Sequence, residues 1–382
     1  MRDAVIAAAV RTPVGKRDGG LSGIHPVDLS AHVLDALVQR TGLDPALVDD
    51  VIWGCVSQTG EQAVNIARNA VLAAGWPEDV PGVTIDRQCG SSQQALHFAA
   101  AGVLSGQYDV AVAGGVESMS RVPMLCTITQ GPGAPFGPRM TARYENWTFN
   151  QGLSAELIAE RWNISRAEAD EISLESHARA ARAIDEGAFA EEIVPVEDVS
   201  VDEGVRRDTS LEKLAGLKPV FREDGLVTAG NSSQISDGAA ALLVTTSEKA
   251  RALGLTPLAR VHTCVMAGTD PILMLTGPIP ATRKALKRAG LGLADIGAFE
   301  VNEAFATVIA AWRREIGQEG DLDYAKVNPL GGAIALGHPL GASGARIATT
   351  LVHHMRRNGI RYGLQTMCEG GGMANATVFE LL

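Results

Sequence analysis

The sequence is poor in aromatic residues, has no excess of positive charge and contains no long hydrophobic run. Aromatic residues make up only 4% of the 382 positions, whereas glycine occurs 42 times. This balance is typical of tight turns and of helices packed closely on sheets, and a hydrophobic content of 46% argues against disorder. The formal net charge of −11 disfavours a nucleic-acid-binding protein and a protein that binds an anionic membrane surface.

The cysteines and the N-terminal segment exclude further classes of protein. No two cysteines have CxxC spacing, which disfavours a disulfide scaffold or a zinc ribbon and fits reduced thiols in the cytoplasm (Cys55, Cys89, Cys126, Cys264 and Cys368). The first hydrophobic run, residues 4–10, is too short to cross a bilayer, and basic residues follow it. A signal peptide has the opposite order, so we expect neither a secretory signal nor a membrane span.

Short hydrophobic segments alternate with helical patterns, which predicts an α/β fold. The N-terminal part is expected to contain a helix and several strands (helix 29–39, strands 4–10, 83–86 and 110–113, the last broken by Gly114 and Gly115). The residues after Cys89 have helical hydrophobic spacing and end at a glycine (Leu96, Ala100, Val103, Leu104 and Gly106). A strand therefore leads into a turn at Cys89, and a helix leaves it.

The C-terminal part repeats this order. Residues 326–328 lead into a glycine-rich turn, residues 331–344, and a helix follows that ends at Gly359 with basic residues in its last turn. Residues 364–367 then lead into Cys368 and three glycines. The repetition indicates a duplicated α/β unit.

The segment between the two parts, residues 120–227, has a different character. Ser165 and Glu168 form a capping box that should open a long polar helix. Basic residues outnumber acidic ones in residues 206–222, although the chain as a whole is acidic. That stretch is either a solvated loop or a landing site for a phosphorylated ligand.

Cys89 has the strongest local case for chemistry. A thiol at a helix entrance feels unpaired N–H groups and the positive end of the helix dipole, which favour the thiolate. The same N–H groups could stabilise an oxyanion after attack on a carbonyl. We therefore expect Cys89 to be a nucleophile rather than a packing residue.

Three further residues have both a structural and a catalytic interpretation. His338 lies in the glycine-rich turn, where it is either structural or a general base for a thiol. Asn302 follows a predicted strand and is either a helix N-cap or an amide that orients a water or carbonyl. Cys368 precedes three glycines whose N–H groups can form an anion-binding nest. The other histidines are expected to be structural.

Together these segments resemble the signatures of the thiolase family, in the family's order. The resemblance rests on seven motifs (residues 11–15, Cys89-Gly90, 228–233, 237–240, 302–305, 331–339 and 368–372) and spans nearly the whole chain. It implies an α/β thiolase-like fold of two similar βαβαβαββ halves in a layered α/β/α/β/α core, with an inserted loop domain. The expected boundaries are residues 1–119 and 228–246 for the N-terminal half, 120–227 for the loop domain over the coenzyme A (CoA) site, and 247–382 for the C-terminal half.

The resemblance also implies a role for each site residue. Cys89 is similar to the nucleophile that becomes acylated, and His338 to the base that activates it and later the incoming CoA thiol. Cys368 resembles the acid/base that protonates the departing enolate. Asn302 resembles the residue that positions a water and, with His338, stabilises the enolate. The N–H groups of Cys89 and Gly370 would form a second oxyanion hole, and five residues would contact CoA or substrate (Arg206, Phe221, Ser233, Met274 and Phe305).

The implied activity is CoA-dependent cleavage of a 3-ketoacyl-CoA, or the reverse condensation, with CoA as substrate and no metal or permanently bound cofactor. We expect a homodimer or homotetramer in a bacterial cytoplasm, without nucleic-acid or membrane partners. Three departures from the family pattern stand out: Ser92 where many relatives have glycine, Asn328-Pro329-Leu330 before the paired glycines, and no His-Met pair in residues 149–152.

The last departure favours a degradative thiolase for acyl groups longer or bulkier than acetoacetyl, and residues 234–238 resemble bacterial thiolases that shorten sterol side chains. The alternatives are a biosynthetic acetoacetyl-CoA thiolase and, more remotely, a non-catalytic relative that binds acyl-CoA or lipid. Ketoacyl synthases on the same fold pair their cysteine with two histidines, so Asn302 and Cys368 disfavour them.

Overall fold

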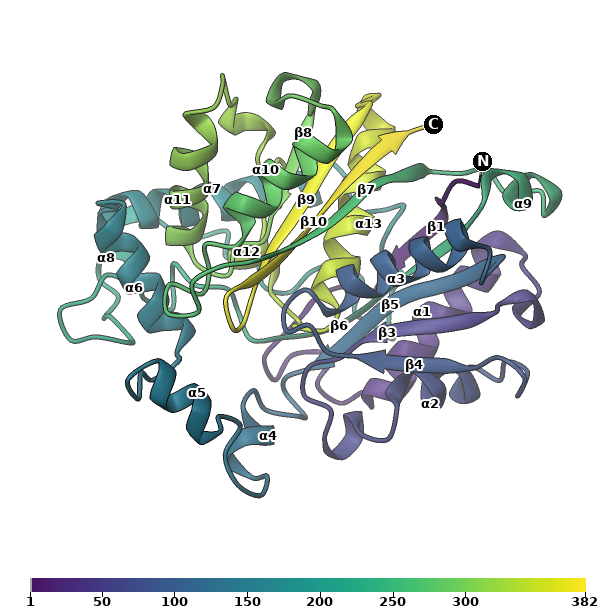
Figure 1. The fold of residues 1–382 in the computed structure, drawn as a ribbon, viewed down its shortest axis with the longest axis horizontal. Coiled ribbons are helices and arrows are strands. Elements are labelled where there is room, and N and C mark those ends of the chain that lie inside the picture. The colour runs from purple at the N-terminus through teal and green to yellow at the C-terminus, as the bar shows by residue number, and fades with distance from the viewer. Residues whose placement is uncertain (1) are drawn as a thin grey trace.

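A mixed sheet of ten strands forms the centre of the computed structural model, which describes residues 2–382 (Figure 1). The strands are β1 (Val5–Arg11), β2 (Gly15–Lys16), β3 (Asp50–Gly54), β4 (Gly82–Ile85), β5 (Val110–Ser118), β6 (Ser236–Thr245), β7 (Ala259–Gly268), β8 (Ala298–Val301), β9 (Tyr362–Glu369) and β10 (Met373–Leu381). Their order is β4-β3-β5-β6-β1-β7-β10-β9-β8, with β2 paired to β6. A short antiparallel pairing of β1 with β7 joins the two halves.

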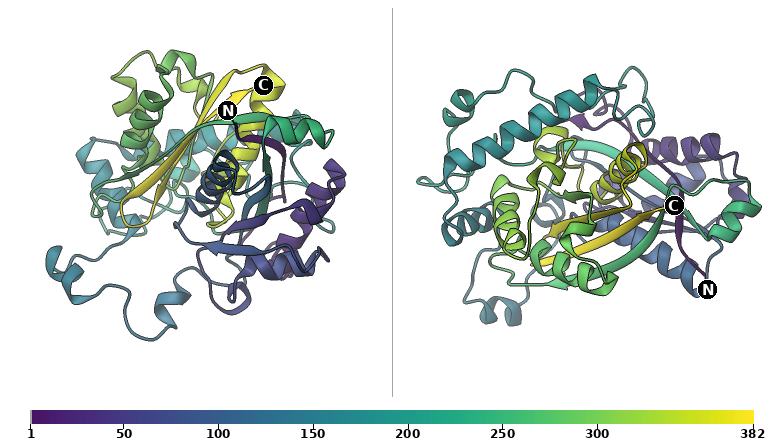
Figure 2. Two further views of the ribbon diagram at one scale, coloured as in Figure 1. Left: turned by 45° about the vertical axis from the view of Figure 1, so that its right-hand side comes forward. Right: turned by 90° about the horizontal axis from the view of Figure 1, so that it is seen from above.

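Helices cover both halves of the sheet and fill the space between them (Figures 1 and 2). The helices of this core are α1 (Pro26–Thr41), α2 (Ile66–Ala73), α3 (Ser91–Ser105), α10 (Pro278–Ala289), α11 (Ala306–Gly317) and α13 (Ser343–Asn358). α1 and α2 pack on the strands of the N-terminal half, and α10 packs on β7, β9 and β10. α3 and α13 pack against each other in the middle, and α13 contacts strands of both halves. The layered α/β/α/β/α core expected from the resemblance is confirmed.

The order of elements shows the duplication, except that one strand of the C-terminal half is replaced by a single β-bridge. The N-terminal half runs β1-α1-β3-α2-β4-α3-β5-β6, which is the expected βαβαβαββ pattern. In the C-terminal half the strand expected near residues 326–328 is only an isolated parallel bridge between Val327 and Phe299. Both central helices end as predicted, at Gly106 (φ 80°) and Gly359 (φ 62°), where glycine tolerates the left-handed conformation.

The prediction that Gly114 and Gly115 break a strand is wrong. β5 continues through both residues to Ser118 and stays paired with β3 and β6. A Cβ on Gly114 would lie 2.3 Å from the Trp53 ring, and one on Gly115 would lie 2.2 Å from the Gly341 carbonyl oxygen. The glycines therefore mark close approach of neighbours to the strand rather than its end.

Residues 120–227 add helices and connecting loops but no strand to the central sheet, within the part of the chain that the structure describes. They contain α4 (Cys126–Thr129), α5 (Pro138–Arg143), α6 (Gln151–Arg161), α7 (Arg166–Asp185) and α8 (Leu211–Ala215). Ser165 caps α7 by accepting from the Glu168 N–H, as predicted, whereas the Glu168 carboxylate accepts from Arg314 instead of completing a capping box. α4 and α5 extend away from the sheet at the lower left of Figure 1. No helix in residues 2–382 is both long and apolar enough to cross a membrane.

Candidate active site

Cys89 lies in the turn between β4 and α3, directly before Gly90 at the helix N-cap. Its side chain is buried, and Ile347 and Met367 pack against it. Burial raises the pKa of Cys89 to about 12, and the nearby Glu369 carboxylate adds to the effect. The expectation that the helix entrance would favour the thiolate is therefore wrong for the resting site. A base has to take the proton before the sulfur can attack.

His338 is the base that the resemblance implies for this proton. The His338 Nδ1 lies 2.5 Å from the Ser343 Oγ, and the Ser343 hydroxyl donates its only proton to the Pro339 carbonyl oxygen at 2.8 Å. The ring must therefore donate from Nδ1, which leaves the lone pair on Nε2. Burial, with a contribution from Arg346, lowers the pKa of His338 to about 3, so the ring is neutral at neutral pH. An unprotonated Nε2 is the form that a general base requires.

Asn302 faces the same nitrogen of His338. The Asn302 Nδ2 lies 3.3 Å from the His338 Nε2, and the Asn302 Oδ1 is buried without a hydrogen-bond partner in residues 2–382. α11 begins only at Ala306, with Phe305 at its N-cap, so the N-cap interpretation of Asn302 is excluded. The amide instead forms the polar end of the site, where it can orient the imidazole, a water or a carbonyl oxygen.

Cys368 lies near the end of β9, buried in the hydrophobic core of the C-terminal half. Burial raises the pKa of Cys368 well above its usual value, and the proximity of Cys89 raises it further. The two thiols therefore lie within electrostatic reach of each other, and each is held in its protonated form. A protonated thiol beside a second nucleophilic thiol suits an acid that works after the first has reacted.

The glycine turn after Cys368 lies against the nucleophile turn. A Cβ on Gly370 would lie 3.0 Å from the Oε1 of Gln88, the residue before Cys89. Gly371 and Gly372 have φ values of 83° and 77°, which side chains disfavour. The turns that carry the Cys89 and Gly370 N–H groups are thus adjacent, and the oxyanion hole formed by those groups stays a prediction.

Polar residues that sequence reasoning missed hold the histidine turn in place. The Ser236 Oγ accepts from the His338 N–H at 3.1 Å, and the Gln234 Nε2 donates to the carbonyl oxygens of Ile334 and Ala335 at 2.8 and 3.1 Å. Such supports are separated from His338 by about a hundred residues in the chain, so no local pattern could have identified them.

Glu303 plays a similar part for the Asn302 turn. Its buried carboxylate accepts from the Ser176 hydroxyl at 2.7 Å, the Asn328 amide at 3.0 Å and the Ile334 N–H at 3.2 Å. It therefore ties the end of β8 to the glycine-rich turn and to α7. Asn328, one of the departures from the family pattern, serves this network.

Ser92, a second departure from the family pattern, has a structural role. The Ser92 Oγ accepts from the Ala345 N–H at 2.8 Å, where α3 and α13 cross. The crossing is close, since a Cβ on Gly344 would lie 2.2 Å from the Gln93 N. The serine therefore joins the helix that follows the nucleophile to the helix that follows the base.

Two family models match nearly all of the chain. The thiolase N-terminal domain matches residues 4–248, and the thiolase C-terminal domain matches residues 255–381. The chain belongs to the thiolase family. The resemblance drawn from the sequence motifs is thus confirmed over both halves.

Individual relatives of this thiolase agree with that assignment. It is 53% identical to the steroid 3-ketoacyl-CoA thiolase FadA6 of Mycobacterium tuberculosis, over 100% of this chain and 95% of the relative. It is 48% identical to the 3-ketoacyl-CoA thiolase of Yersinia pestis over the full length of both. The crystal structure of the Bacillus anthracis acetyl-CoA acetyltransferase has a TM-score of 0.91 and 42% identity, covering 100% of this chain and 99% of that one.

Three of the five residues expected to contact the ligand lie around the start of α11 in this thiolase, and a fourth, Met274, lies in the hydrophobic core of the same half. The rings of Phe221 and Phe305 meet edge to face with centroids 6.1 Å apart. Met274 lies in the same hydrophobic core as Phe305, and the Ser233 N–H donates to the Ala304 carbonyl oxygen at 2.9 Å. Phe305 is three residues after Asn302, so these apolar side chains adjoin the polar end of the site.

The fifth residue, Arg206, is exposed in the basic stretch of this thiolase. Three other basic residues of that stretch are neutralised by local ion pairs (Arg207 with Asp185, Lys213 with Asp208 and Arg222 with Glu160). Arg206 and Lys218 form no ion pair in residues 2–382, so they are the cations of this stretch available to a phosphate. The interpretation of this stretch as a landing site for a phosphorylated ligand stays a prediction.

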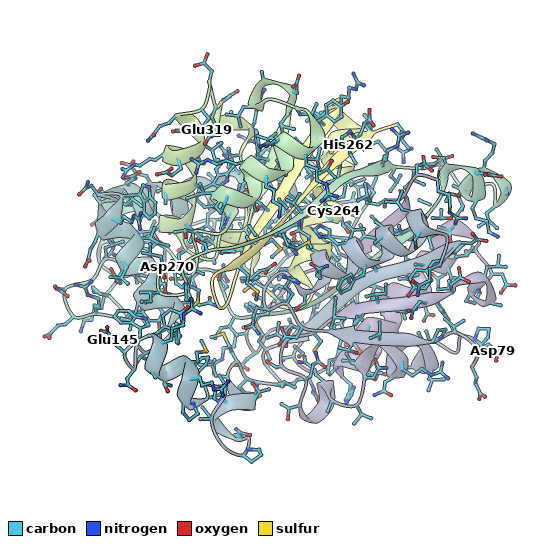
Figure 3. All side chains as sticks on the ribbon, viewed as in Figure 1. Asp79, Glu145, His262, Cys264, Asp270 and Glu319 are labelled. Atoms are coloured by element: carbon cyan, nitrogen blue, oxygen red, sulfur yellow. The ribbon has the colours of Figure 1, made fainter. Side chains whose placement is uncertain are left out.

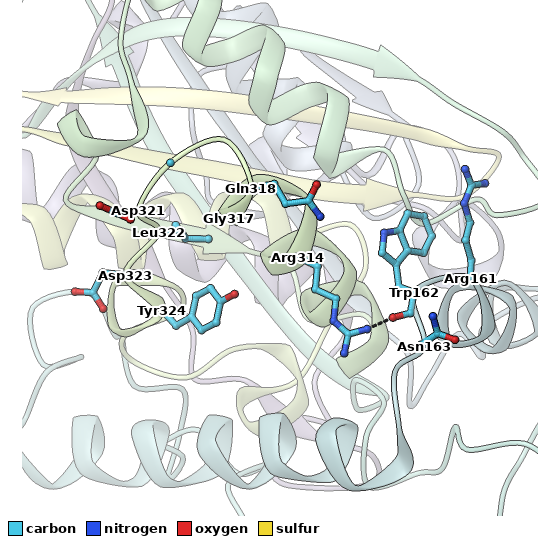
Figure 4. Close-up of a pocket in the computed structure, with 11 residues that line it drawn as sticks. Arg161, Trp162, Asn163, Arg314, Gly317, Gln318, Asp321, Leu322, Asp323 and Tyr324 are labelled. Atoms are coloured by element: carbon cyan, nitrogen blue, oxygen red, sulfur yellow. Dashed lines mark hydrogen bonds between the residues drawn. The ribbon is translucent and has the colours of Figure 1, made fainter.

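The groove in Figure 4 has a volume of about 820 Å³ and lies beside the opposite end of α11. Arg161, Trp162, Arg314 and Tyr324 are among its lining residues, and no residue expected in the site lines it. In residues 2–382, no three or more His, Cys, Asp or Glu side chains are grouped so that they could hold a metal ion. The groove is therefore separate from the residues expected in the site around Cys89.

His262 and Cys264 lie together along β7, where they have structural partners (Figure 3). The His262 Nδ1 is 2.9 Å from the Thr263 hydroxyl, and its ring meets the Tyr362 ring edge to face. Cys264 packs against the central hydrophobic cluster. The structural interpretation of His262 therefore holds. Cys264 is a partly buried thiol outside the expected site, so its replacement can serve as a control for replacement of Cys89.

Ser343→Ala should lower kcat of this thiolase by about 2- to 12-fold, since one neutral hydrogen bond contributes about 0.5–1.5 kcal/mol. Loss of the hydroxyl frees the imidazole to rotate away from the orientation in which Nε2 faces Asn302. Steady-state kinetics with a 3-ketoacyl-CoA test this, and Ser343→Thr, which keeps a hydroxyl, should retain more activity than Ser343→Ala. An unchanged kcat in Ser343→Ala would show that the hydrogen bond does not orient the base.

Proposed function

We propose that this thiolase cleaves a 3-ketoacyl-CoA to acetyl-CoA and a shortened acyl-CoA through an acyl-Cys89 intermediate, or runs the reverse condensation. The observation that carries the proposal is the pair of buried thiols, in which Cys89 raises the pKa of Cys368. The neutral His338, held by Ser343 and Asn302, would supply the base. The names of the relatives support the substrate class. A non-catalytic relative is disfavoured because all four catalytic positions are present.

The residues divide the reaction into balanced steps. His338 Nε2 takes the Cys89 proton, and the sulfur attacks the 3-keto carbon. The bond between C2 and C3 then breaks, its electrons pass to the acetyl-CoA enolate, and the Cys368 thiol protonates the enolate carbon. The Cys368 thiolate then takes back the proton that His338 holds, and in the second half the neutral His338 takes the proton of the incoming CoA thiol. The CoA sulfur attacks the thioester, and the protonated His338 returns its proton to Cys89.

The division of labour follows from the state of each group. An acylated sulfur has no proton to give, so a second thiol has to supply the acid. Burial keeps that thiol protonated until the carbanion forms, because a carbanion is a far stronger base than a buried thiolate. The developing oxyanion of the first step would be held by the N–H groups of Cys89 and Gly370, and the enolate by Asn302 and His338.

The remaining assignments concern the ligand and the assembly. Phe221, Ser233, Met274 and Phe305 would line the pantetheine and acyl path, and Arg206 would meet a phosphate of CoA. Residues 120–227 would form the loop domain over that site, inserted between N-terminal (1–119 and 228–246) and C-terminal (247–382) halves. We propose a cytoplasmic homodimer or homotetramer, in line with the family.

The acyl preference can be tested directly with a series of 3-ketoacyl-CoA substrates from four carbons to steroid-like acyl groups. We expect kcat/KM to rise from acetoacetyl-CoA to longer or bulkier substrates by about tenfold or more, since each buried methylene contributes about 0.8 kcal/mol. Spectrophotometric thiolysis assays measure this. Fastest turnover of acetoacetyl-CoA would contradict the preference and favour the biosynthetic alternative.

A further inference from the structure

Glu369 is a buried carboxyl group next to the nucleophile that the steps above do not use. It follows Cys368 on β9 and points to the opposite face of the strand, toward the entrance of α3. Its side chain is fully buried, and neither carboxylate oxygen has a hydrogen-bond partner in residues 2–382. A buried carboxylate without partners is costly, so this group needs an explanation.

The contact with Gly90 shows where the carboxyl lies. A Cβ on Gly90 would lie 2.1 Å from the Glu369 Oε1 and 3.0 Å from the Asn375 Nδ2. Glu369 therefore occupies the space that a side chain at Gly90 would need, one residue after Cys89. The Asn375 amide donates to the Gly90 carbonyl oxygen at 3.2 Å, and its Oδ1 is buried and unpartnered. The carboxyl group thus lies directly under the nucleophile turn, in a region where the Asn375 Oδ1 also has no hydrogen-bond donor.

We propose that Glu369 is a positioning residue for the nucleophile. The neutral Glu369 carboxyl group lies under the Cys89 turn, and the charged carboxylate disfavours the Cys89 thiolate. The proposal rests on the proposed function, in which Cys89 is the nucleophile. The charge on Glu369 adds to the effect of burial in keeping Cys89 as a thiol at alkaline pH, so that the reactive thiolate forms there only when His338 takes the proton. Electrophiles and oxidants other than the substrate would then meet an unreactive sulfur.

The charges that face Glu369 fit this role. Burial raises the pKa of Glu369 to about 8; Arg87 opposes the shift and Asp86 adds to it. Arg87 forms no ion pair with Glu369 in residues 2–382 and instead contacts the Met373 sulfur at 4.0 Å.

The other elements packed against the carboxyl add no opposing charge. β10 presents Met373 and Asn375, and the titratable residue of α3 is His97, whose lowered pKa of about 3 keeps it neutral. The neighbouring Cys89 and Cys368 are both protonated thiols at neutral pH. Because Glu369 loses its proton as the pH rises through about 8, its charge above that pH adds to the effect of burial on the pKa of Cys89.

The rate of Cys89 alkylation by iodoacetamide tests the proposal, measured from pH 6 to 10 by mass spectrometry of the Cys89 peptide. Above pH 8, Glu369→Gln should alkylate about tenfold faster or more than the unmodified protein, because a charge at this range shifts a pKa by about 1–3. Glu78→Gln is the matched control, since Glu78 is exposed and water screens its charge, so its effect should be much smaller. Identical profiles for Glu369→Gln and the unmodified protein would overturn the proposal.

A second measurement needs no variant of Glu369. Burial also raises the pKa of Glu300 to about 8, so infrared spectroscopy is applied to Glu300→Gln, which should show a protonated carboxyl band at neutral pH that disappears as the pH passes about 8. A carboxyl already ionised at pH 6 would overturn the proposal even if Glu369→Gln fails to fold. Thiolysis is measured separately, so its absence would contradict the proposed function, whereas an unchanged alkylation profile would contradict only the role of Glu369.

Discussion

Cys89→Ser should reduce thiolysis of a 3-ketoacyl-CoA by at least about 1,000-fold, as removal of a nucleophile does in other covalent enzymes. A hydroxyl is harder to deprotonate than a thiol and forms a less reactive ester with the acyl group. His338, which is a weak base because of its burial, cannot compensate for that difference. The measurement is kcat/KM in the presence of saturating CoA.

Cys264→Ser is the control for this variant. Cys264 is also a thiol whose pKa is raised to about 12 by burial, but it lies on β7. Its replacement should leave kcat/KM within a few-fold of the unmodified enzyme. If Cys89→Ser kept most of the activity while remaining folded, Cys89 would not be the nucleophile, and the non-catalytic binding alternative would gain support.

Cys368→Ala should separate the two halves of the reaction. Thiolysis should fall by about 100- to 10,000-fold, the range for loss of a general acid or base. Acetylation of Cys89 by acetyl-CoA should change by no more than about tenfold, because a departing CoA thiolate needs far less help from an acid than a departing carbanion. The loss of rate in Cys368→Ala is therefore expected only in the step in which the carbon–carbon bond breaks or forms.

Single-turnover acetylation and steady-state thiolysis of the same Cys368→Ala preparation provide this comparison. A parallel loss of both activities would mean that Cys368 acts on Cys89 itself or on the packing of the site. A loss of neither would assign the acid to another group, such as His338. Either result would contradict the division of labour between the two thiols.

The main features of the fold were predictable because they depend on local patterns. Helical spacing after Cys89 and glycines at the helix ends located both central helices, and the repeated order of elements revealed the duplication. The patterns failed where tertiary contacts decide. Gly114 and Gly115 remain in β5 because the Trp53 ring and the Gly341 carbonyl lie against them. A strand near Val327 shrinks to a single bridge, which no local pattern indicates.

The candidate site was predictable in its residues but not in its electrostatics. The motifs located Cys89, His338, Asn302 and Cys368, and the structure joins His338 to Asn302 by a hydrogen bond. The pKa of Cys89 goes the opposite way from the expectation, because burial outweighs the helix entrance. Burial depends on packing by distant segments, which cannot be derived from the residues next to the cysteine.

The supporting residues were missed for the same reason. Ser343 orients the base through Nδ1, Glu303 fixes the Asn302 turn and Glu369 lies under the nucleophile. In a sequence, a serine at the start of a helix suggests a cap, and a glutamate suggests an exposed charge. Their buried partners come from other elements, so only the folded chain reveals what they contact.

Trapping of the acyl-enzyme tests the central claim most directly. The enzyme is mixed with acetyl-CoA in the absence of free CoA, quenched in acid, digested and examined by mass spectrometry. The account predicts one acetyl group on the peptide that contains Cys89, no acetyl group on the peptide that contains Cys368, and no label in Cys89→Ser. An active enzyme that carries no acetyl group on Cys89, or carries it on Cys368, would contradict the account.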